Sequence, residues 1–121
     1  MTVKLVVVSH SEKIADGAVE LAAQMAPDVL ILAAGGTDDG RIGTSLERVM
    51  AALEQAADAN SDGTVVLTDL GSAVMTAESA MEFVADPSAV LLADAPLVEG
   101  LVAAAVAAQA GADAAGVKEA A

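Results

Sequence analysis

The sequence predicts an α/β fold, built as an open, doubly wound and mainly parallel sheet of four or five strands with helices on both faces. Short runs of β-branched and aliphatic residues alternate with segments whose apolar residues recur at helical spacing. The strand runs are continuously apolar, which is typical of a parallel sheet buried on both faces. The length of 121 residues is close to the commonest size of one domain, so we expect residues 1–121 to form a single domain.

The first part of the chain predicts a strand, a helix, a second strand and a loop. Residues 2–8 (TVKLVVV) form the first strand. The apolar residues of the following segment recur at helical spacing, at Ile14, Ala18, Leu21 and Met25. Pro27 ends this helix, residues 29–32 form a second short strand, and a glycine-rich loop follows over residues 35–40.

A second helix is expected to start at a capping box, because residues 44–47 (TSLE) have the T-x-x-E pattern. We expect Leu46, Met50 and Leu53 to point inward from this helix. The helix is expected to end near residues 60–63, where polar residues and a glycine gather.

The remaining sequence predicts two further strands, each followed by a helix. Residues 64–67 (TVVL) and 89–92 (AVLL) form the strands. The helix between them carries apolar residues at Val74, Ala77, Met81 and Val84. The final helix opens at Leu97 and loses definition after Gly111. It is apolar nearly all round, so either a subunit interface or a deeply buried core position would cover its second side.

Composition and charge exclude several classes of protein. The chain has no cysteine, which removes disulfide scaffolds, cysteine-based zinc sites and thiol nucleophiles, and suits a reducing compartment. A net charge of −13 argues against a nucleic-acid partner, because phosphate backbones attract clustered lysine and arginine. The most apolar stretch, residues 95–112, contains Pro96 and Glu99 and falls short of the roughly 18 apolar residues that a spanning helix needs. We therefore expect a cytoplasmic protein that binds neither nucleic acid nor a membrane.

The candidate site lies where the predicted strands end, because function in open α/β sheets gathers at the carboxyl ends of the strands. His10, the only histidine, directly follows the first strand. Residues 9–12 match the S-x-x-E capping box, which would make Ser9 the N-cap and place His10 in the first helical turn. Asp69 follows the third strand, which in the usual order of such sheets lies beside the first, so its carboxylate could hold one ring nitrogen of His10. The alternative is that His10 lies on a surface loop and Asp69 is a turn residue.

This position would suit a phosphorylated histidine. A phosphoryl group adds nearly two negative charges to an acidic chain, so unpaired N–H groups and a helix dipole would have to stabilise it locally. Ser11 could donate its hydroxyl, and the turn at Gly71 and Ser72 could donate N–H groups. The neutral imidazole is the nucleophilic form, provided that one ring nitrogen carries a proton and the other is free. The sequence has neither a standard nucleotide-binding glycine motif nor a metal-ligand cluster, so we expect this chain to bind no cofactor or metal.

Four segments carry a resemblance to a known family. They are VVSHS at residues 7–11, IGTS at 42–45, LTDLGSA at 67–73 and APLVEG at 95–100. In this order, over nearly the whole chain, they resemble the phosphotransferase subunits of bacterial phosphoenolpyruvate-dependent dihydroxyacetone kinases (DhaM), whose domain is of the mannose-family enzyme IIA type. The resemblance implies that family's doubly wound fold, which generally forms homodimers.

The resemblance also implies a phosphotransferase activity, that of a phosphoenolpyruvate–glycerone phosphotransferase subunit. In the family, the phosphocarrier protein HPr phosphorylates the histidine that matches His10. This histidine rephosphorylates ADP bound to the kinase subunit DhaL, and the resulting ATP phosphorylates dihydroxyacetone on the subunit DhaK. ADP and ATP are thus held by the partner only. The family's pattern assigns Asp69 to the ring nitrogen of His10 that does not take the phosphate, and leaves open which nitrogen that is.

Three other functions are compatible with the sequence. Enzyme IIA domains that feed sugar transport share His10 and the LTD segment ending at Asp69. A receiver-like signalling domain would instead be phosphorylated on Asp69, although residues 9–11 stand where receivers cluster acidic residues for a metal. A non-catalytic dimerising or ligand-binding module would explain the apolar last helix.

Overall fold

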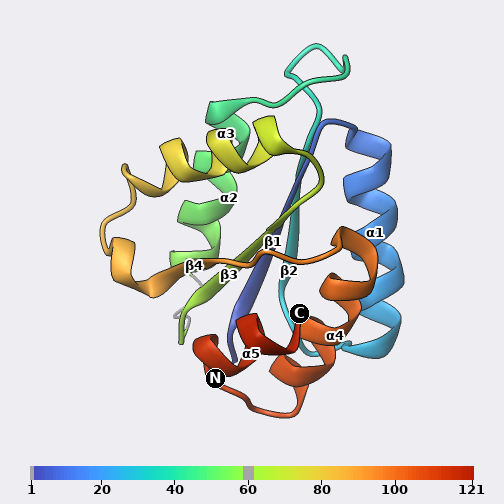
Figure 1. The fold of residues 1–121 in the computed structure, drawn as a ribbon, viewed down its shortest axis with the longest axis vertical. Coiled ribbons are helices and arrows are strands. Elements are labelled where there is room, and N and C mark those ends of the chain that lie inside the picture. The colour runs from blue at the N-terminus through green and yellow to red at the C-terminus, as the bar shows by residue number, and fades with distance from the viewer. Residues whose placement is uncertain (1, 59–61) are drawn as a thin grey trace.

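The computed structural model describes residues 2–58 and 62–121. Within this part of the chain, a four-stranded parallel sheet in the order β2-β1-β3-β4 forms the centre of the molecule (Figure 1). Its strands are β1 (Lys4–Ser9), β2 (Ile31–Gly35), β3 (Thr64–Thr68) and β4 (Val90–Leu92). The α/β prediction is confirmed, with four strands.

Helices cover both faces of this sheet, as expected for a doubly wound fold (Figure 1). Helices α1 (Glu12–Met25) and α4 (Leu97–Gln109) pack together on one face, where α5 (Ala114–Ala120) joins α4. Helices α2 (Leu46–Asp58) and α3 (Gly71–Met81) pack together on the other. The chain leaves β1 towards β2 and later returns to β3 on the other side of β1. The carboxyl ends of β1 and β3 therefore flank the switch point at which open α/β sheets bind their ligands.

Alternate strand residues pack into two separate core layers. The layer beneath α1 and α4 contains Leu5, Val7, Val65 and Leu67 from the strands. The layer beneath α2 and α3 contains Val6, Val8 and Val66. Because side chains alternate across a strand, these continuously apolar runs supply both layers at once.

Helix α1 buries its alanines, and its large apolar residues face outward. Ala15, Ala18 and Ala22 lie against the sheet. Ile14, Leu21 and Met25, which the helical spacing grouped with Ala18, are 51%, 49% and 60% exposed. The helix was thus correctly predicted, but three of the four residues that predicted it lie off its buried face. Small side chains let the helix backbone approach the sheet closely, so the shortest apolar residues face inward.

The start of α2 differs by one residue from the predicted capping box. The hydroxyl of Ser45 accepts a hydrogen bond from the Arg48 N–H at 3.2 Å, so Ser45 caps the helix. The hydroxyl of Thr44 instead hydrogen bonds that of Thr76 at 2.7 Å. Leu46, the first residue of α2, is 38% exposed, against expectation, whereas Leu53 is buried as predicted and Met50 packs against the core.

The predicted end of α2 falls near residues 60–63, and of these, residues 60 and 61 lie outside the described residues. Further along, α3 ends at Met81, before the predicted Val84. A short 3-10 turn, η1 (Pro87–Ala89), then precedes β4.

The last part of the chain contains a helix that the sequence did not predict. Asp113 caps α5 by accepting a hydrogen bond from the Gly116 N–H at 2.9 Å. Val117 of α5 is fully buried in the core layer beneath α4. Helix α4 is therefore a core helix covered by the sheet, α1 and α5, although Val106 remains 48% exposed. No helix in the described part of the chain is long and apolar enough to cross a membrane.

Candidate functional site

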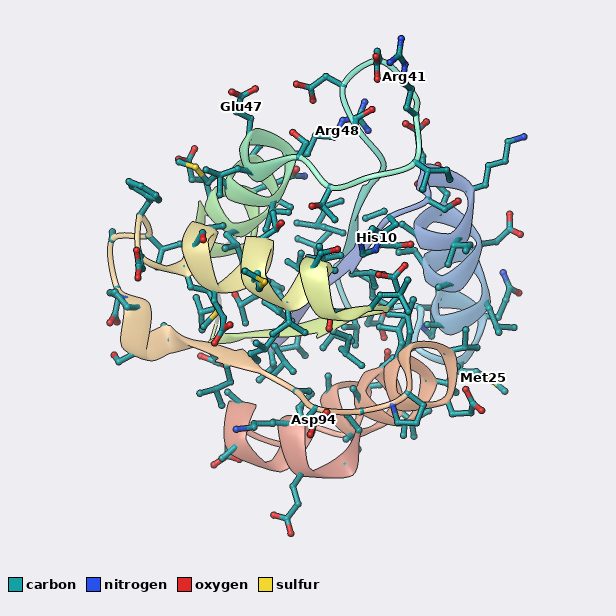
Figure 2. All side chains as sticks on the ribbon, turned by 45° about the horizontal axis from the view of Figure 1, so that its top comes forward. His10, Met25, Arg41, Glu47, Arg48 and Asp94 are labelled. Carbon is teal, nitrogen blue, oxygen red and sulfur yellow. The ribbon has the colours of Figure 1, made fainter. Side chains whose placement is uncertain are left out.

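His10 and Asp69 meet at the switch point between β1 and β3. The pairing of β1 with β3 places Val8 opposite Thr68, so the residues that follow both strands emerge side by side. Ring atom Nδ1 of His10 lies 2.8 Å from Oδ1 of Asp69. Figure 2 shows His10 among α1, α3 and the loop that carries Arg41. The two residues that sequence analysis selected, 59 positions apart, are thus in direct contact.

The carboxylate of Asp69 accepts four hydrogen bonds. Its Oδ2 accepts from the Ser9 hydroxyl at 2.7 Å and from the backbone N–H of His10 at 3.0 Å. Its Oδ1 accepts from the backbone N–H of Leu70 at 2.8 Å, in addition to the His10 ring. Burial by itself raises the pKa of the Asp69 carboxyl, but these hydrogen bonds outweigh burial and leave the pKa lower than its ordinary value. Asp69 is therefore a carboxylate at neutral pH.

This arrangement determines which nitrogen of His10 carries the proton in the neutral ring. An ionised carboxylate can only accept, so Nδ1 is the donor to Asp69. In the neutral ring Nε2 then has a free electron pair, and it faces the hydroxyl of Ser72, which contacts it. The His10 side chain is 18% exposed. The geometry presents Nε2 as the nucleophilic atom.

Ser9 has a different role from the N-cap predicted for it. Its side chain is fully buried at the end of β1, where its hydroxyl donates to Asp69 and accepts from the Ser11 N–H at 3.0 Å. Ser11 is the N-cap of α1, with its hydroxyl accepting from the Ile14 N–H at 3.2 Å. His10 consequently precedes the helix and does not lie in its first turn.

Two helix N-termini lie beside the His10 ring. Helix α1 begins two residues after His10, and α3 begins at Gly71, one residue before the Ser72 that contacts Nε2. The first N–H groups of a helix have no partner inside the helix, and the dipole there favours negative charge. The structure thus brings Gly71 and Ser72 to the ring, while the Ser11 hydroxyl oxygen already serves as a cap.

The glycine-rich loop between β2 and α2 holds the backbone of the site. The Gly43 N–H donates to the carbonyl of His10 at 2.8 Å, and the Gly36 N–H donates to the carbonyl of Ser9 at 3.1 Å. Gly43 has a φ of +146° and Gly36 of +71°, values that residues with a side chain rarely adopt. The loop therefore fixes the main chain on both sides of the Ser9–His10 bond.

An arginine that the sequence analysis did not select ties this loop to α1. Arg48 forms ion pairs with Glu12 at 3.0 Å and Asp38 at 3.2 Å and also donates to the Gly35 carbonyl. The pairing was not visible in the sequence, because Glu12 and Asp38 precede Arg48 by 36 and 10 positions. Elsewhere in the described part of the chain, no three His, Cys, Asp or Glu residues come together as metal ligands.

Comparison with known proteins shows the family of the chain. Residues 4–118 match the family EIIA-man, described as the PTS system fructose IIA component. The chain belongs to this family. The match covers every strand and helix that positions His10 and Asp69.

Curated relatives are named as phosphoryl donor or phosphotransferase subunits (DhaM) of dihydroxyacetone kinases. The chain is 47% identical over 117 residues to the phosphoryl donor subunit DhaM of a PEP-dependent dihydroxyacetone kinase from Escherichia coli. The matched region covers 92% of this chain but only 24% of that protein. It is 40% identical to a DhaM of Listeria innocua, covering 86% of this chain and 84% of that one. It is 36% identical to DhaM of Lactococcus lactis, and this match covers 98% of this chain and 93% of that one. The chain thus spans about a quarter of the length of the E. coli relative and most of the other two.

Solved structures show the same fold. The crystal structure of EF1359, a protein of unknown function, superposes with a TM-score of 0.87 at 32% identity, covering 98% of this chain and 92% of that one. A sigma-54 interaction domain protein from Enterococcus faecalis gives a TM-score of 0.76 at 14% identity, covering 98% and 86%, and shares the fold alone.

Proposed function

We propose that His10 carries a phosphoryl group on Nε2, receiving it from HPr and passing it to ADP bound on a DhaL subunit. The ATP formed there would phosphorylate dihydroxyacetone on DhaK. The observation that carries this proposal is the hydrogen bond of 2.8 Å between Nδ1 and Asp69, which leaves Nε2 as the unprotonated ring atom. The DhaM names of the relatives support the choice of pathway.

The transfer requires positioning more than acid or base catalysis. The electron pair of Nε2 attacks the phosphorus of the donor, and the bond from phosphorus to the donor atom breaks with its electrons returning to the donor. The proton on Nδ1 stays in place, because Asp69 stabilises the positive charge that the ring acquires. In the second transfer a phosphate oxygen of ADP attacks the same phosphorus, and the bond to Nε2 breaks.

Groups around Nε2 would stabilise the phosphoryl oxygens. The Ser72 hydroxyl, which now contacts Nε2, would turn to donate to an oxygen of the phosphoryl group. The N–H groups of Gly71 and Ser72 at the start of α3 would add to it, with the helix dipole worth roughly 0.3–1 kcal/mol. A hydrogen of the Ser11 hydroxyl remains for the same purpose, because its oxygen acts as acceptor in the cap.

The proposal extends to cofactors and assembly. In it, this chain holds no nucleotide and no metal, and ADP and ATP bind only to the DhaL partner. A homodimer is part of the proposal, as the family resemblance implies. The chain acts as the phosphotransferase subunit of the kinase and contributes the carrier histidine.

A second candidate is an enzyme IIA domain that feeds sugar transport. The description of the matching family as a fructose IIA component favours it. The same Nε2 chemistry would apply, with a different acceptor. Phosphorylation on Asp69, by contrast, has little support, because each carboxylate oxygen already accepts two hydrogen bonds.

Intact mass measurement tests the carrier role. The chain and a His10→Ala variant are incubated with phosphoenolpyruvate, enzyme I and HPr, and kept at alkaline pH, where phosphohistidine survives and acyl phosphate does not. We expect one phosphoryl mass increment on the parent and none on the variant. An increment on both would move the site to another residue, and none on either would rule out the relay.

A further inference from the structure

Helix α3 begins at a residue that cannot cap it. The N-cap position is occupied by Leu70, whose apolar side chain cannot accept a hydrogen bond from the first turn. Gly71 follows, and glycine favours a helix less than alanine does. Yet this first turn carries Ser72, whose hydroxyl contacts Nε2 of His10. The position of that hydroxyl therefore depends on other contacts of the turn.

Two threonine hydroxyls supply such contacts. The Thr76 hydroxyl donates to the carbonyl of Ser72 at 3.1 Å, across one turn of α3. Its single hydrogen is used there, so the Thr76 oxygen accepts in its contact with the Thr44 hydroxyl at 2.7 Å, and Thr44 donates. Hydrogen bonds aligned in this way polarise and strengthen one another. The result is a directed chain of hydrogen bonds from Thr44 through Thr76 to the main chain of Ser72.

The segment that carries Thr44 also holds the main chain of His10. The N–H of Gly43 donates to the carbonyl of His10 at 2.8 Å, and Thr44 is the next residue. From Thr44 the contacts continue through Thr76 to Ser72. The Ser72 hydroxyl then returns to ring atom Nε2 of His10, which closes a circuit. The separation between Nε2 and the Ser72 hydroxyl is thus tied to the bond between the two threonines.

The threonine pair lies between two packed helices. Thr44 precedes α2 and Thr76 is on α3, and the two helices pack together on one face of the sheet (Figure 1). Both threonines are partly buried, so water competes for their hydroxyls less than it would at an open surface. The pair therefore joins the start of α2 to the first turn of α3 beside the nucleophilic atom.

We propose that Thr44 and Thr76 are positioning residues for phosphoryl transfer, which hold the Ser72 hydroxyl where it donates to the phosphoryl group on Nε2. The inference rests on the carrier role proposed above. Both threonines act through Ser72, so neither has to reach the phosphoryl group. A donor that is already in place stabilises developing charge more than one that must first reorient. A displacement of about 1 Å at such a position can slow a reaction by about 100-fold.

Valine substitutions test the threonines, because valine has the shape of threonine without the hydroxyl. Thr76→Val removes both hydrogen bonds of the chain, and Thr44→Val removes only the outer one. Thr76→Ser keeps the hydroxyl, and Ser79→Ala is the control that removes an exposed hydroxyl further along α3. The measurement is the rate at which His10 is phosphorylated by phosphorylated HPr and, separately, by phosphoramidate, a small donor that needs no protein interface.

We expect the rate with either donor to fall about tenfold or more for Thr76→Val and about threefold or more for Thr44→Val, with KM for HPr changed less than about twofold. Thr76→Ser and Ser79→Ala should stay within about twofold of the parent. A loss with both donors is what a displaced Ser72 hydroxyl predicts, whereas a residue that only contacts HPr would affect the protein donor alone. Thermal unfolding shows that each variant is folded at the temperature of the assay.

A double-mutant cycle asks whether Thr76 acts through Ser72. In a Ser72→Ala background the hydroxyl that Thr76 positions is gone, so Thr76→Val should then slow labelling by less than about twofold. A loss in that background as large as in the parent would overturn the proposal, because Thr76 would then act independently of the Ser72 hydroxyl.

The positioning role and the carrier role fail in different ways. If HPr and phosphoramidate label the parent and both valine variants at equal rates, the positioning role is wrong and the carrier role stands. If HPr does not label the parent while phosphoramidate does, the relay from HPr fails. The phosphoramidate rates of the parent and the valine variants then decide by themselves whether the threonines position Ser72.

Discussion

Asp69 accepts two hydrogen bonds from the single residue His10, one from ring atom Nδ1 at 2.8 Å and one from the backbone N–H at 3.0 Å. The carboxylate thus fixes both the plane of the ring and the main chain that carries it. Since the pKa of Asp69 is lowered, the carboxylate stays ionised wherever the chain is used near neutral pH. The second ring nitrogen faces outward to Ser72.

Replacing Asp69 by Asn should slow phosphorylation of His10 strongly. An amide can present its NH2 group to Nδ1, which would move the ring proton to Nε2 and block the nucleophile. A similar change beside a catalytic histidine in serine proteases costs about 10⁴-fold. We expect a loss of at least about 100-fold in the rate at which HPr labels the chain, measured by quenched-flow mass analysis.

Asp94→Asn is the matched control for this prediction. Asp94 is an exposed aspartate shortly after β4, at the same edge of the sheet, and no hydrogen bond joins it to His10 in the described part of the chain. Its substitution should leave the labelling rate within about threefold of the parent, as is usual for surface changes. Equal losses in both variants would mean that negative charge, and not the orientation of the ring, is what Asp69 supplies.

Ser9→Ala should destabilise the folded chain. Ser9 is fully buried, and its hydroxyl both donates to Asp69 and accepts from the Ser11 N–H. Removing it leaves two polar groups short of a partner, which costs about 1–3 kcal/mol. The pKa of Asp69 should rise, because one hydrogen bond that lowers it is lost. Urea unfolding measures the cost, and Ser79→Ala, an exposed serine on α3, should change the free energy of unfolding by less than about 0.5 kcal/mol.

The stabilising effect of Asp69 should disappear in acid. Because folding lowers the pKa of Asp69, the folded chain binds this proton less tightly than the unfolded chain does. The contribution of Asp69 to the free energy of unfolding is complete above the ordinary pKa of the carboxyl, 3.8. It is lost as the pH falls below 3.8 towards the lower pKa of Asp69 in the folded chain. The difference in free energy of unfolding between the parent and Asp69→Asn should therefore be constant from pH 7 to about pH 5 and shrink below about pH 4. A difference that stays constant to pH 3 would contradict the lowered pKa.

Gly35→Ala should destabilise the contact between β2 and α1. A Cβ at Gly35 would lie 2.6 Å from the Ser11 carbonyl oxygen, 2.7 Å from the Cβ of Ala15 and 2.8 Å from the Cα of Glu12. Since these are main-chain or adjacent atoms, α1 would have to move, at a cost of about 1–3 kcal/mol. Helix α1 begins two residues after His10, so HPr labelling should slow as well.

Gly17→Ala provides the contrast. Gly17 lies in the middle of α1, and a Cβ there meets nothing within 4 Å. This change should raise the free energy of unfolding by about 0.5–1 kcal/mol, because alanine favours the helix more than glycine does. Thermal unfolding of both variants would show opposite shifts if close packing at Gly35 is the reason for its glycine.

The sequence was enough to predict the contact between His10 and Asp69. Each residue follows a strand, and the parallel order of such sheets places those two strands side by side. It was not enough to predict the role of Ser9. A serine three residues before a glutamate matches a capping box, yet the Ser9 hydroxyl is held by a carboxylate 60 positions away, and the cap passes to Ser11.

Helix faces were also harder to predict than helices. The hydrophobic pattern that predicts α1 depends mainly on its large apolar side chains. In the structure, the residues that pack against the sheet are alanines such as Ala15 and Ala22, because the helix lies close to the sheet. The last helix, α5, is short and rich in alanine, so no periodic pattern marks it, and one buried residue, Val117, anchors it. In both places the decisive quantity is the distance between packed elements, which a single sequence does not contain.

The most direct test of the carrier role follows the phosphoryl group through the second transfer. The chain is phosphorylated with HPr, separated from the donor and mixed with ADP-loaded DhaL. Intact mass of the chain and the ATP formed are then measured together. The account predicts that the mass increment is lost as one equivalent of ATP appears, and that the His10→Ala variant yields none. Release of inorganic phosphate without ATP, or a phosphorylated chain that keeps its increment in the presence of DhaL, would contradict it.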